Sequence, residues 1–484
     1  MGSSHSTPSE DLNENTVHDS IQDLPRETTT IEEDPYQRQT GDMDIEHIDR
    51  QREKSFFFRN FSPVQKGGLR SSLFTLFSST LGAGLLSLPK IISMYGIGLG
   101  MGLLCSFALL TRHTYMILDD LVRQSGKKSY ANMCSHFLGR GPARAIVLFM
   151  IFSLQSWGIL YASVSWQFLS TLIKDFGWVN LPYSNPISQE IDQNASLTVK
   201  WRFICMGIMA LFVFPFVYQK SLGTLRYVSV YIFCAMLFTI VLVMVQFPGY
   251  FQQYGSSIDY TVELEAKKPS MKWFQGLATL MLSYYSQVLF FYVRGELASK
   301  TVSRVSKLVN ILLIVVTIFF GTFACIGYLS LGDKMLPNLF TLRRPLHPGD
   351  NDYLMKTAQI ALNLATLLKI SIVLYPCREQ ILIFYRLNRT LAIHVGLTVL
   401  IVIVAFAVPA LYPDIIGTLG LVGGVTMGTT GYTIPLMLKL SSLKGTNKNI
   451  ERIVNYILLA VVISIQILSV YASVFNDESE ASGH

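Results

Sequence analysis

The sequence predicts an all-α membrane protein with eleven transmembrane helices. Half of its 484 residues are hydrophobic, only 15% are charged, and the mean hydropathy is +0.39. Globular proteins carry about 25% charged residues, and a single hydrophobic core stops growing beyond roughly 300 residues. A soluble fold could not bury this much apolar surface, whereas a lipid bilayer covers it.

A transmembrane helix needs about 20 mostly apolar residues, and the chain holds eleven runs of that kind. They lie near residues 71–92, 97–118, 145–172, 202–218, 226–247, 274–293, 308–331, 355–376, 391–411, 414–438 and 453–475. A shorter segment at 129–138 predicts an interfacial helix in the second connection.

The charge divides the chain into two unlike parts. Residues 1–50 hold thirteen Asp or Glu and three Arg, a net charge of −10, and the remaining residues carry +17. An acidic, Ser/Thr/Asn-rich segment with almost no aromatic residues cannot bury enough surface to order itself. We therefore predict a disordered acidic tail over residues 1–68, a helical domain over 69–476 and a short outer tail over 477–484. The basic excess then belongs to membrane loops, and no nucleic-acid partner is expected.

Lysine and arginine in the connections set the orientation in the bilayer. With the N-terminus in the cytosol, the inner connections hold eighteen of these residues and the outer connections ten. The C-terminus is then outside or lumenal. This topology places the sequon at Asn194 outside, which predicts a glycoprotein. The opening Met1–Ser6 segment fits the pattern for myristoylation at Gly2, although one acyl chain adds little to eleven spans.

No motif for a cofactor or an enzyme is found. The six cysteines form no CxxC pair or Cys/His cluster, so we expect neither a metal nor a disulfide framework. No Walker motif or Ser/His/Asp arrangement occurs, which argues against an ATP-driven pump and an intramembrane enzyme. A channel is disfavoured because no ring of charges or filter-like repeat is visible.

Glycines and hydroxyl residues interrupt the first span, in the order Ser78-Ser79-Thr80-Leu81-Gly82-Ala83-Gly84. Gly82 and Gly84 weaken a helix in mid-membrane, and an unwound stretch would expose backbone N–H and C=O groups to a ligand. Irregular backbone at membrane depth is tolerated only where it lines a cavity or is buried in protein. The alternative is a small-residue face for helix packing, and this segment alone leaves both readings open.

The sixth span repeats the pattern five spans later, where Leu282-Ser283-Tyr284-Tyr285-Ser286-Gln287 interrupts an apolar run. Unusual segments at corresponding positions of two halves indicate an inverted-repeat transporter with its site at the midplane. Half-helix N-termini there favour an anionic group such as a carboxylate. No Gly or Pro lies in this second segment, so its unwinding has less support in the sequence than that of the first.

Several short motifs follow one another in a recognisable order over about residues 70–475. They are Thr80–Pro89 in the first span, Tyr292–Leu297 closing the sixth, Gly327–Gly332 closing the seventh, Tyr375–Arg378 closing the eighth, and Pro413–Ile415 with Leu421–Gly424 in the tenth. In these motifs the chain resembles the amino acid/auxin permease (AAAP) family of eukaryotic amino acid transporters. The resemblance implies a LeuT-type fold, with inverted repeats at about 70–250 and 272–440 and an eleventh transmembrane helix at about 452–475.

The family resemblance further implies that the broken first and sixth spans hold the substrate and that transport proceeds by alternating access. The candidate substrate-binding residues are then Ser79, Thr80, Gly82, Ala83, Gly84, Ser283, Tyr284, Gln287 and, on the third span, Tyr161. Trp157 on the third span is a further candidate for the wall of the site, and ordinary helix packing is the favoured alternative for it.

Lys369 lies well inside the eighth span. A cation at that depth costs roughly 2.5–3.5 kcal/mol on insertion scales and usually lines a cavity or a coupling path. In sodium-coupled relatives a hydroxyl residue near this place helps the first span to hold the ion, and Ser78 stands where such relatives often carry Asn. We hypothesise that the Lys369 ammonium stands in for sodium. The alternatives are a lysine that snorkels toward the inner face or one that pairs with a carbonyl.

The leading function is a monomeric secondary active transporter of amino acids, either sodium-independent or a proton-linked symporter. No acidic residue occurs in the first or sixth span, which favours neutral substrates. The alternative is an amino acid sensor of the same fold that signals through its cytosolic tail. Both the plasma membrane and an endolysosomal or vacuolar membrane are compatible with the sequence.

Overall fold

The computed structural model describes most of the chain beyond position 67. The described residues are 68–127, 130–182, 191–219, 226–254, 272–297, 300–331, 352–388, 390–412, 418, 420–445 and 447–475. Gly2, nearly all of the predicted N-terminal tail, the predicted C-terminal tail and the Pro413–Ile415 motif lie outside them.

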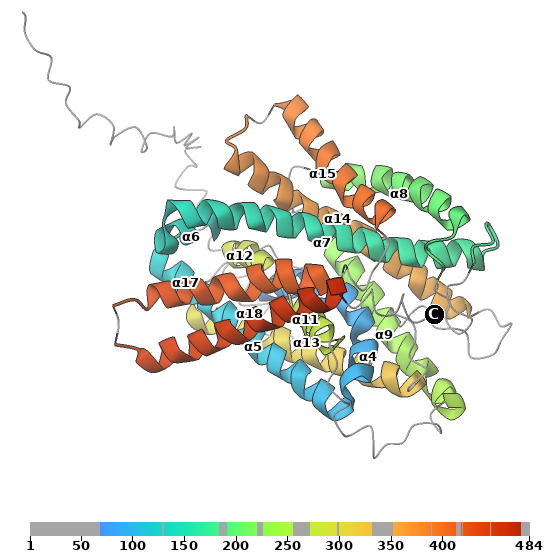
Figure 1. Cartoon of the computed structure of the whole chain (residues 1–484), viewed down its shortest axis with the longest axis horizontal. Coiled ribbons are helices and arrows are strands. Elements are labelled where there is room, and N and C mark those ends of the chain that lie inside the picture. Colours follow the sequence, from blue (N-terminus) through green and yellow to red (C-terminus); the bar gives the residue numbers. More distant parts are fainter. Residues whose placement is uncertain are drawn as a thin grey trace, which may run out of the picture. The chain divides into compact units, whose positions relative to one another are not determined.

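Each extended secondary-structure element among the described residues is a helix (Figure 1). In chain order the helices are α3 (Leu69–Thr80), α4 (Ala83–Tyr95), α5 (Ile97–Ser125), α6 (Tyr130–Leu138), α7 (Arg140–Asp175), α8 (Ser196–Val217), α9 (Arg226–Tyr254), α11 (Lys272–Ser283), α12 (Gln287–Glu296), α13 (Val302–Leu331), α14 (Tyr353–Phe384), α15 (Leu391–Leu411), the π-helices η6 (Val422–Met427) and η7 (Thr429–Thr433), α17 (Ile434–Ser442) and α18 (Asn449–Phe475).

The described helices confirm an all-α, multi-pass membrane protein. Nine of them, with α11 and α12 counted together, are long and apolar enough to cross a membrane, and the bent pair α3–α4 makes a tenth. The predicted span at 414–438 coincides in part with η6, η7 and α17, and some of its residues are not described. The count of eleven therefore stays a prediction.

The peripheral helices expose the apolar surface that lipid requires. In the most apolar stretch of α18 only 17% of the residues are buried, and in that of α15 only 28%. Large side chains such as Leu211, Leu400 and Ile467 are more than half exposed. Soluble proteins rarely expose large continuous apolar patches, whereas the hydrocarbon of a bilayer covers them at no cost.

Two of the membrane helices are interrupted near their midpoints. α3 ends at Thr80 and α4 begins at Ala83, and the axis bends by 52° between them. α11 ends at Ser283 and α12 begins at Gln287, which leaves Tyr284–Ser286 between the two halves. The interruption predicted for the first span is present, and the sixth span is also interrupted although it has no Gly or Pro at the break. Each half is 10 to 13 residues long, so both breaks lie deep within the fold.

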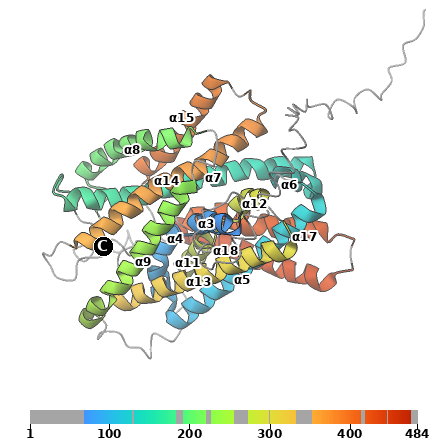
Figure 2. The same ribbon diagram turned by 180° about the vertical axis from the view of Figure 1, so that it is seen from behind.

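The helices pack in two groups that meet at these breaks. α14 packs along α7, and α8 and α15 pack against them (Figures 1 and 2). In the other group, α13 packs against α3, α4 and α5, and α11 packs against α4. α9 contacts α13 as well as α14, and η6 contacts both α7 and α11. The arrangement brings α7 and α14 up to the two interrupted helices.

Candidate functional site

The first break offers main-chain groups. Gly82 has an extended backbone (φ −147°, ψ −154°), and its carbonyl accepts a hydrogen bond from Leu85 N at 3.1 Å. The first N–H groups of a helix have no acceptor within that helix. In α4 these include the amides of Ala83 and Gly84, which lie at the break. The N-terminus of a helix also carries about half a positive charge. This half-helix end is therefore suited to a carboxylate.

The hydroxyls beside the first break are turned back onto their own helix. Ser78 donates to the carbonyl of Thr75 at 3.0 Å, and Ser79 and Thr80 donate to the carbonyl of Leu76 at 2.7 and 2.8 Å. Each hydroxyl has a single proton. These three side chains can therefore accept a hydrogen bond from a ligand but have no proton left to donate.

The two breaks touch each other directly. A Cβ atom added to Gly84 would lie 2.8 Å from Cα of Ser283, which is closer than real side chains come, so only glycine lets the start of α4 pack on the end of α11. A second link joins the hydroxyls of Thr80 and Ser286, which are 3.0 Å apart. The structure thus brings together Thr80, Gly84 and Ser283, which the sequence predicted as parts of one site.

Lys369 reaches the first break from α14. Its ammonium donates to the carbonyl of Leu81 and lies 5.4 Å from the centre of the Tyr161 ring, within the range of a cation–π contact. The side chain is only 2% exposed, and no described carboxylate lies within ion-pair distance of it. Of the alternatives raised by the sequence, the lysine pairs with a carbonyl, and that carbonyl belongs to the interrupted helix. It does not snorkel toward a surface.

Aromatic side chains from α7 form the wall opposite the first break. A Cβ atom on Gly82 would lie 2.8 Å from the Tyr161 hydroxyl, so the absence of a side chain there admits this phenol. Trp157 packs edge-on against Tyr285 of the second break at 5.1 Å and lies 5.9 Å from the Tyr161 ring. Trp157 therefore contacts the interrupted helix as well as its own helix.

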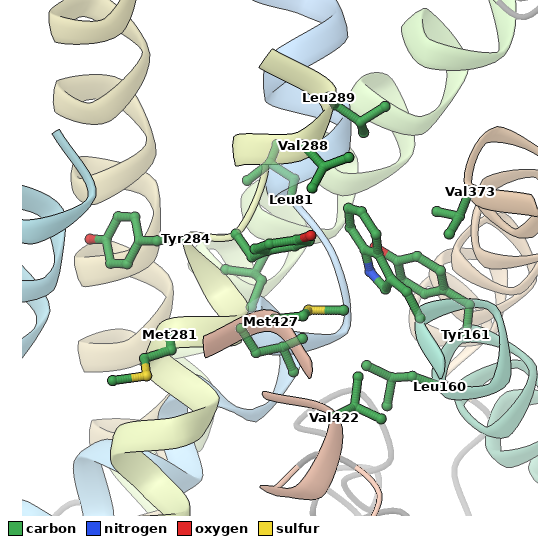
Figure 3. Close-up of a cluster of buried hydrophobic side chains, with 14 of the residues drawn as sticks. Leu81, Leu160, Tyr161, Met281, Tyr284, Val288, Leu289, Val373, Val422 and Met427 are labelled. Carbon is green, nitrogen blue, oxygen red and sulfur yellow. The ribbon is translucent and has the colours of Figure 1, made fainter. Parts of the chain in front are cut away.

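The remaining predicted residues lie at the second break in different orientations. The Tyr284 hydroxyl is 3.0 Å from that of Thr317 on α13, and Figure 3 shows Tyr284 and Tyr161 on opposite sides of Leu81. Only the main chain of Tyr284 lies at the break. Gln287 accepts from Ser286 N at 3.0 Å through Oε1, and its Nε2 lies 3.4 Å from the Thr114 hydroxyl. Gln287 therefore organises the second break internally.

Three residues of this region were not among the predicted site residues. Tyr285 and Ser286 belong to the interrupted hexapeptide, yet the sequence alone did not single them out. Tyr115 lies on α5, and its hydroxyl bonds that of Ser286. Its partner is 171 positions away in the chain, and no local pattern could have indicated the pair.

Charged residues at the end of α5 form ion pairs with other helices. Asp119, which is buried, accepts from Arg294 Nε of α12 at 2.6 Å and from Arg123 Nε at 2.9 Å. The neighbouring Asp120 lies 2.7 Å from Lys439 of α17. The two adjacent carboxylates thus hold two different helices against α5.

Other predicted features lie apart from the breaks. Asn194 is exposed, two residues before α8 begins, and a sequon needs such exposure. Among the described residues no group of three or more His, Cys, Asp or Glu side chains is placed to hold a metal ion.

A comparison with protein families agrees with this architecture. The family described as "Transmembrane amino acid transporter protein" matches residues 65–475, which include both interrupted helices. The chain belongs to this family. Its members are transporters and not enzymes, and the membership accounts for the multi-pass helical fold.

Curated relatives are distant and longer. A protein of Toxoplasma gondii named "Putative amino acid transporter AAT1" is 24% identical over 334 residues, which are 69% of this chain and 42% of the relative. Proteins of the same name from Plasmodium berghei and Plasmodium falciparum are 24% and 22% identical, over 57% and 56% of the chain. The matched regions thus span about two-fifths of the length of these relatives.

Proposed function

We propose that this protein is a secondary active transporter that moves neutral amino acids by alternating access. The observation that carries the proposal is the direct contact of two interrupted membrane helices, with Gly84 packed on Ser283 and Thr80 bonded to Ser286. Helix interruptions at membrane depth hold substrates and coupling ions in transporters of this kind. The amides at the start of α4 would bind the substrate carboxylate, and Tyr161, Trp157 and Tyr285 would face its side chain.

The proposed architecture is LeuT-type, with inverted repeats at about 70–250 and 272–440. Its support is the recurrence of an interruption in the first and sixth predicted spans, together with the packing of the helices in two groups. In alternating access one group rocks against the other around a fixed site. The contacts that cross between the groups, such as Lys369 to Leu81 and Trp157 to Tyr285, would then report the state of the transporter.

We further propose that Lys369 replaces a sodium ion. Unwound carbonyls coordinate the coupling cation in sodium-driven transporters, and here the ammonium bonds a carbonyl of that kind, at Leu81. A fixed positive charge at this place makes transport independent of sodium, and a lysine that releases its proton during the cycle would link transport to protons.

Neutral substrates follow from the chemistry of the two breaks. Neither Leu81–Ser87 nor Ser283–Phe290 contains an Asp or Glu, and the Lys369 ammonium lies at the Leu81 carbonyl. A cationic side chain would meet repulsion there and no counter-charge. We propose a monomer with a cytosolic N-terminus and an outer or lumenal C-terminus, in the plasma membrane or an endolysosomal membrane.

Uptake by the purified full-length protein in proteoliposomes tests these proposals. A panel of radiolabelled amino acids is supplied with and without sodium and with and without an inward proton gradient. We expect neutral amino acids to accumulate without sodium. Binding of an amino acid that never fills the vesicles would instead indicate a sensor.

The lysine is tested in the same assay by Lys369→Met, which keeps most of the length of the side chain and removes the charge. We expect uptake to fall at least about fivefold, because the Leu81 carbonyl loses its partner and an unpaired buried carbonyl costs about 1–3 kcal/mol. Sodium-dependent uptake in the wild type that persists in Lys369→Met would refute the replacement of sodium by the ammonium.

A further inference from the structure

Three hydroxyl groups from different helices meet where the two breaks join. Thr80 is the last residue of α3, Ser286 is the N-cap of α12, and Tyr115 lies in the middle of α5. The Ser286 hydroxyl is 3.0 Å from that of Thr80 and bonds that of Tyr115 as well. All three residues are buried, so the hydrogen bonds among them form in a dry environment.

The protons in this group can be assigned because each hydroxyl has only one. Thr80 gives its proton to the carbonyl of Leu76 at 2.8 Å, which can only accept. Thr80 must therefore accept in its bond with Ser286, and Ser286 donates. The proton of Ser286 is then used, so Tyr115 donates to Ser286. The hydrogen bonds run in one direction, from Tyr115 through Ser286 and Thr80 to the main chain of α3.

Ser286 does not play the usual role of a serine at the start of a helix. A serine at the N-cap of a helix normally accepts a hydrogen bond from the second or third amide of that helix. Ser286 makes no such capping bond, because its side chain is turned toward Thr80 and Tyr115. The amides of Gln287, Val288 and Leu289 are the first of α12 and have no acceptor within the helix. Phe290 is the first whose amide does, bonding the Ser286 carbonyl at 3.0 Å.

We propose that Thr80 and Tyr115 are positioning residues that hold the Ser286 hydroxyl away from the N-terminus of α12 and so keep its first amides open to the substrate. The inference rests on the proposed transport function and identifies what keeps the second break able to bind. Tyr115 contacts α12 at a second point, since its ring also packs edge-on against Phe290 at 5.0 Å.

The test is a comparison of KM and kcat for uptake by the full-length protein in proteoliposomes. Thr80→Val removes the acceptor, so the Ser286 hydroxyl turns onto the amides of α12 and competes with the substrate. We expect KM to rise about fivefold, the size of one capping bond, while kcat changes less than twofold. Thr80→Ser keeps the acceptor and should retain the wild-type KM.

The decisive variant is the double substitution Thr80→Val with Ser286→Ala. Without a hydroxyl at position 286 nothing can cap α12, so KM should return to within about twofold of the value for Ser286→Ala alone. A purely structural role for Thr80 would instead give two defects that add. The matched control is Thr239→Val, which removes an equally buried threonine hydroxyl bonded to a carbonyl four residues back, on α9. It should leave KM unchanged.

Two results would overturn the inference and leave the proposed function intact. The first is a wild-type KM in Thr80→Val. The second is a raised KM that persists when Ser286→Ala is added, which would mean that Thr80 contacts the substrate itself. If Thr80→Val does not fold, Tyr115→Phe serves in its place, with a KM rise of about twofold that Ser286→Ala again removes. Wild-type protein that transports no amino acid would overturn the proposed function, and this inference with it.

Discussion

Substitution of Gly84 by alanine tests the contact between the two breaks most directly. A Cβ atom at this position would lie 2.8 Å from Cα of Ser283, whereas carbon atoms in contact prefer about 3.5–4.0 Å. The start of α4 must therefore move away from α11 by about 0.7 Å or more. The obstructing atom belongs to the main chain, so a change of side-chain rotamer cannot relieve the overlap.

The magnitude follows from two opposing terms. Overpacking of a tight contact costs ~1–3 kcal/mol, and replacing glycine by alanine in a helix gains at most ~1 kcal/mol. We expect a net loss of about 1–2 kcal/mol in stability. In the proposed site the two half-helices hold the substrate together, so KM should rise roughly tenfold.

The assay combines thermal melting of the purified protein with uptake in proteoliposomes. Gly102→Ala is the matched control, because this glycine lies on α5 with nothing within 4 Å of the added Cβ, and we expect it to melt at or above the wild-type temperature. Adding Ser283→Ala to Gly84→Ala should not restore KM, since Cα of residue 283 remains. A Gly84→Ala protein with wild-type melting and KM would refute the close contact of the breaks.

Three further predictions concern other parts of the molecule. Asp119→Asn should lower stability by ~3–5 kcal/mol because it leaves Arg294 buried without its counter-charge. Asp120→Asn should cost less than ~1 kcal/mol because that carboxylate is 44% exposed. Equal melting temperatures for the two variants would contradict this prediction. Cys134 lies on the short helix α6, and burial raises the pKa of its thiol to about 12. The thiol should therefore resist iodoacetamide at pH 8 in the folded protein and react after denaturation. Mass spectrometry measures the modification. Asn194→Gln should remove a glycan-dependent shift in gel mobility from protein made in a eukaryotic cell, and a wild-type protein without such a shift would contradict glycosylation of this residue.

The membrane helices could be predicted from the sequence because the bilayer imposes a length and a polarity that hydropathy measures. The helix at 391–411 was predicted to the residue, as α15. The helix predicted at 145–172 instead runs from Arg140 to Asp175 as α7. Its charged ends remain helical where the chain leaves the apolar layer, and a search for apolar runs cannot detect such extensions.

The first break could be predicted from glycine, but the second break and its contacts could not be predicted in detail. Tyr284 and Tyr285 are adjacent and equally apolar, yet one points to α13 and the other to α7 and η7. An irregular stretch has no period from which such directions could be read. The partner of Lys369 was likewise open in the sequence, because pairing with a carbonyl and replacement of an ion predict the same buried lysine.

The distribution of hydrogen bonds at the site argues for recognition by the main chain. Thr430 gives its proton to the carbonyl of Thr426 at 2.8 Å, so Tyr285 must donate to Thr430 in their 2.9 Å bond. By the same reasoning, the Tyr115 hydroxyl donates its proton to Ser286. The protein thus consumes many of the side-chain protons that could have met a substrate, and the helix-end amides are among the donors that remain at the breaks. Every amino acid carries the carboxylate that such amides bind, so discrimination among substrates would depend on the shape of the aromatic wall around Trp157.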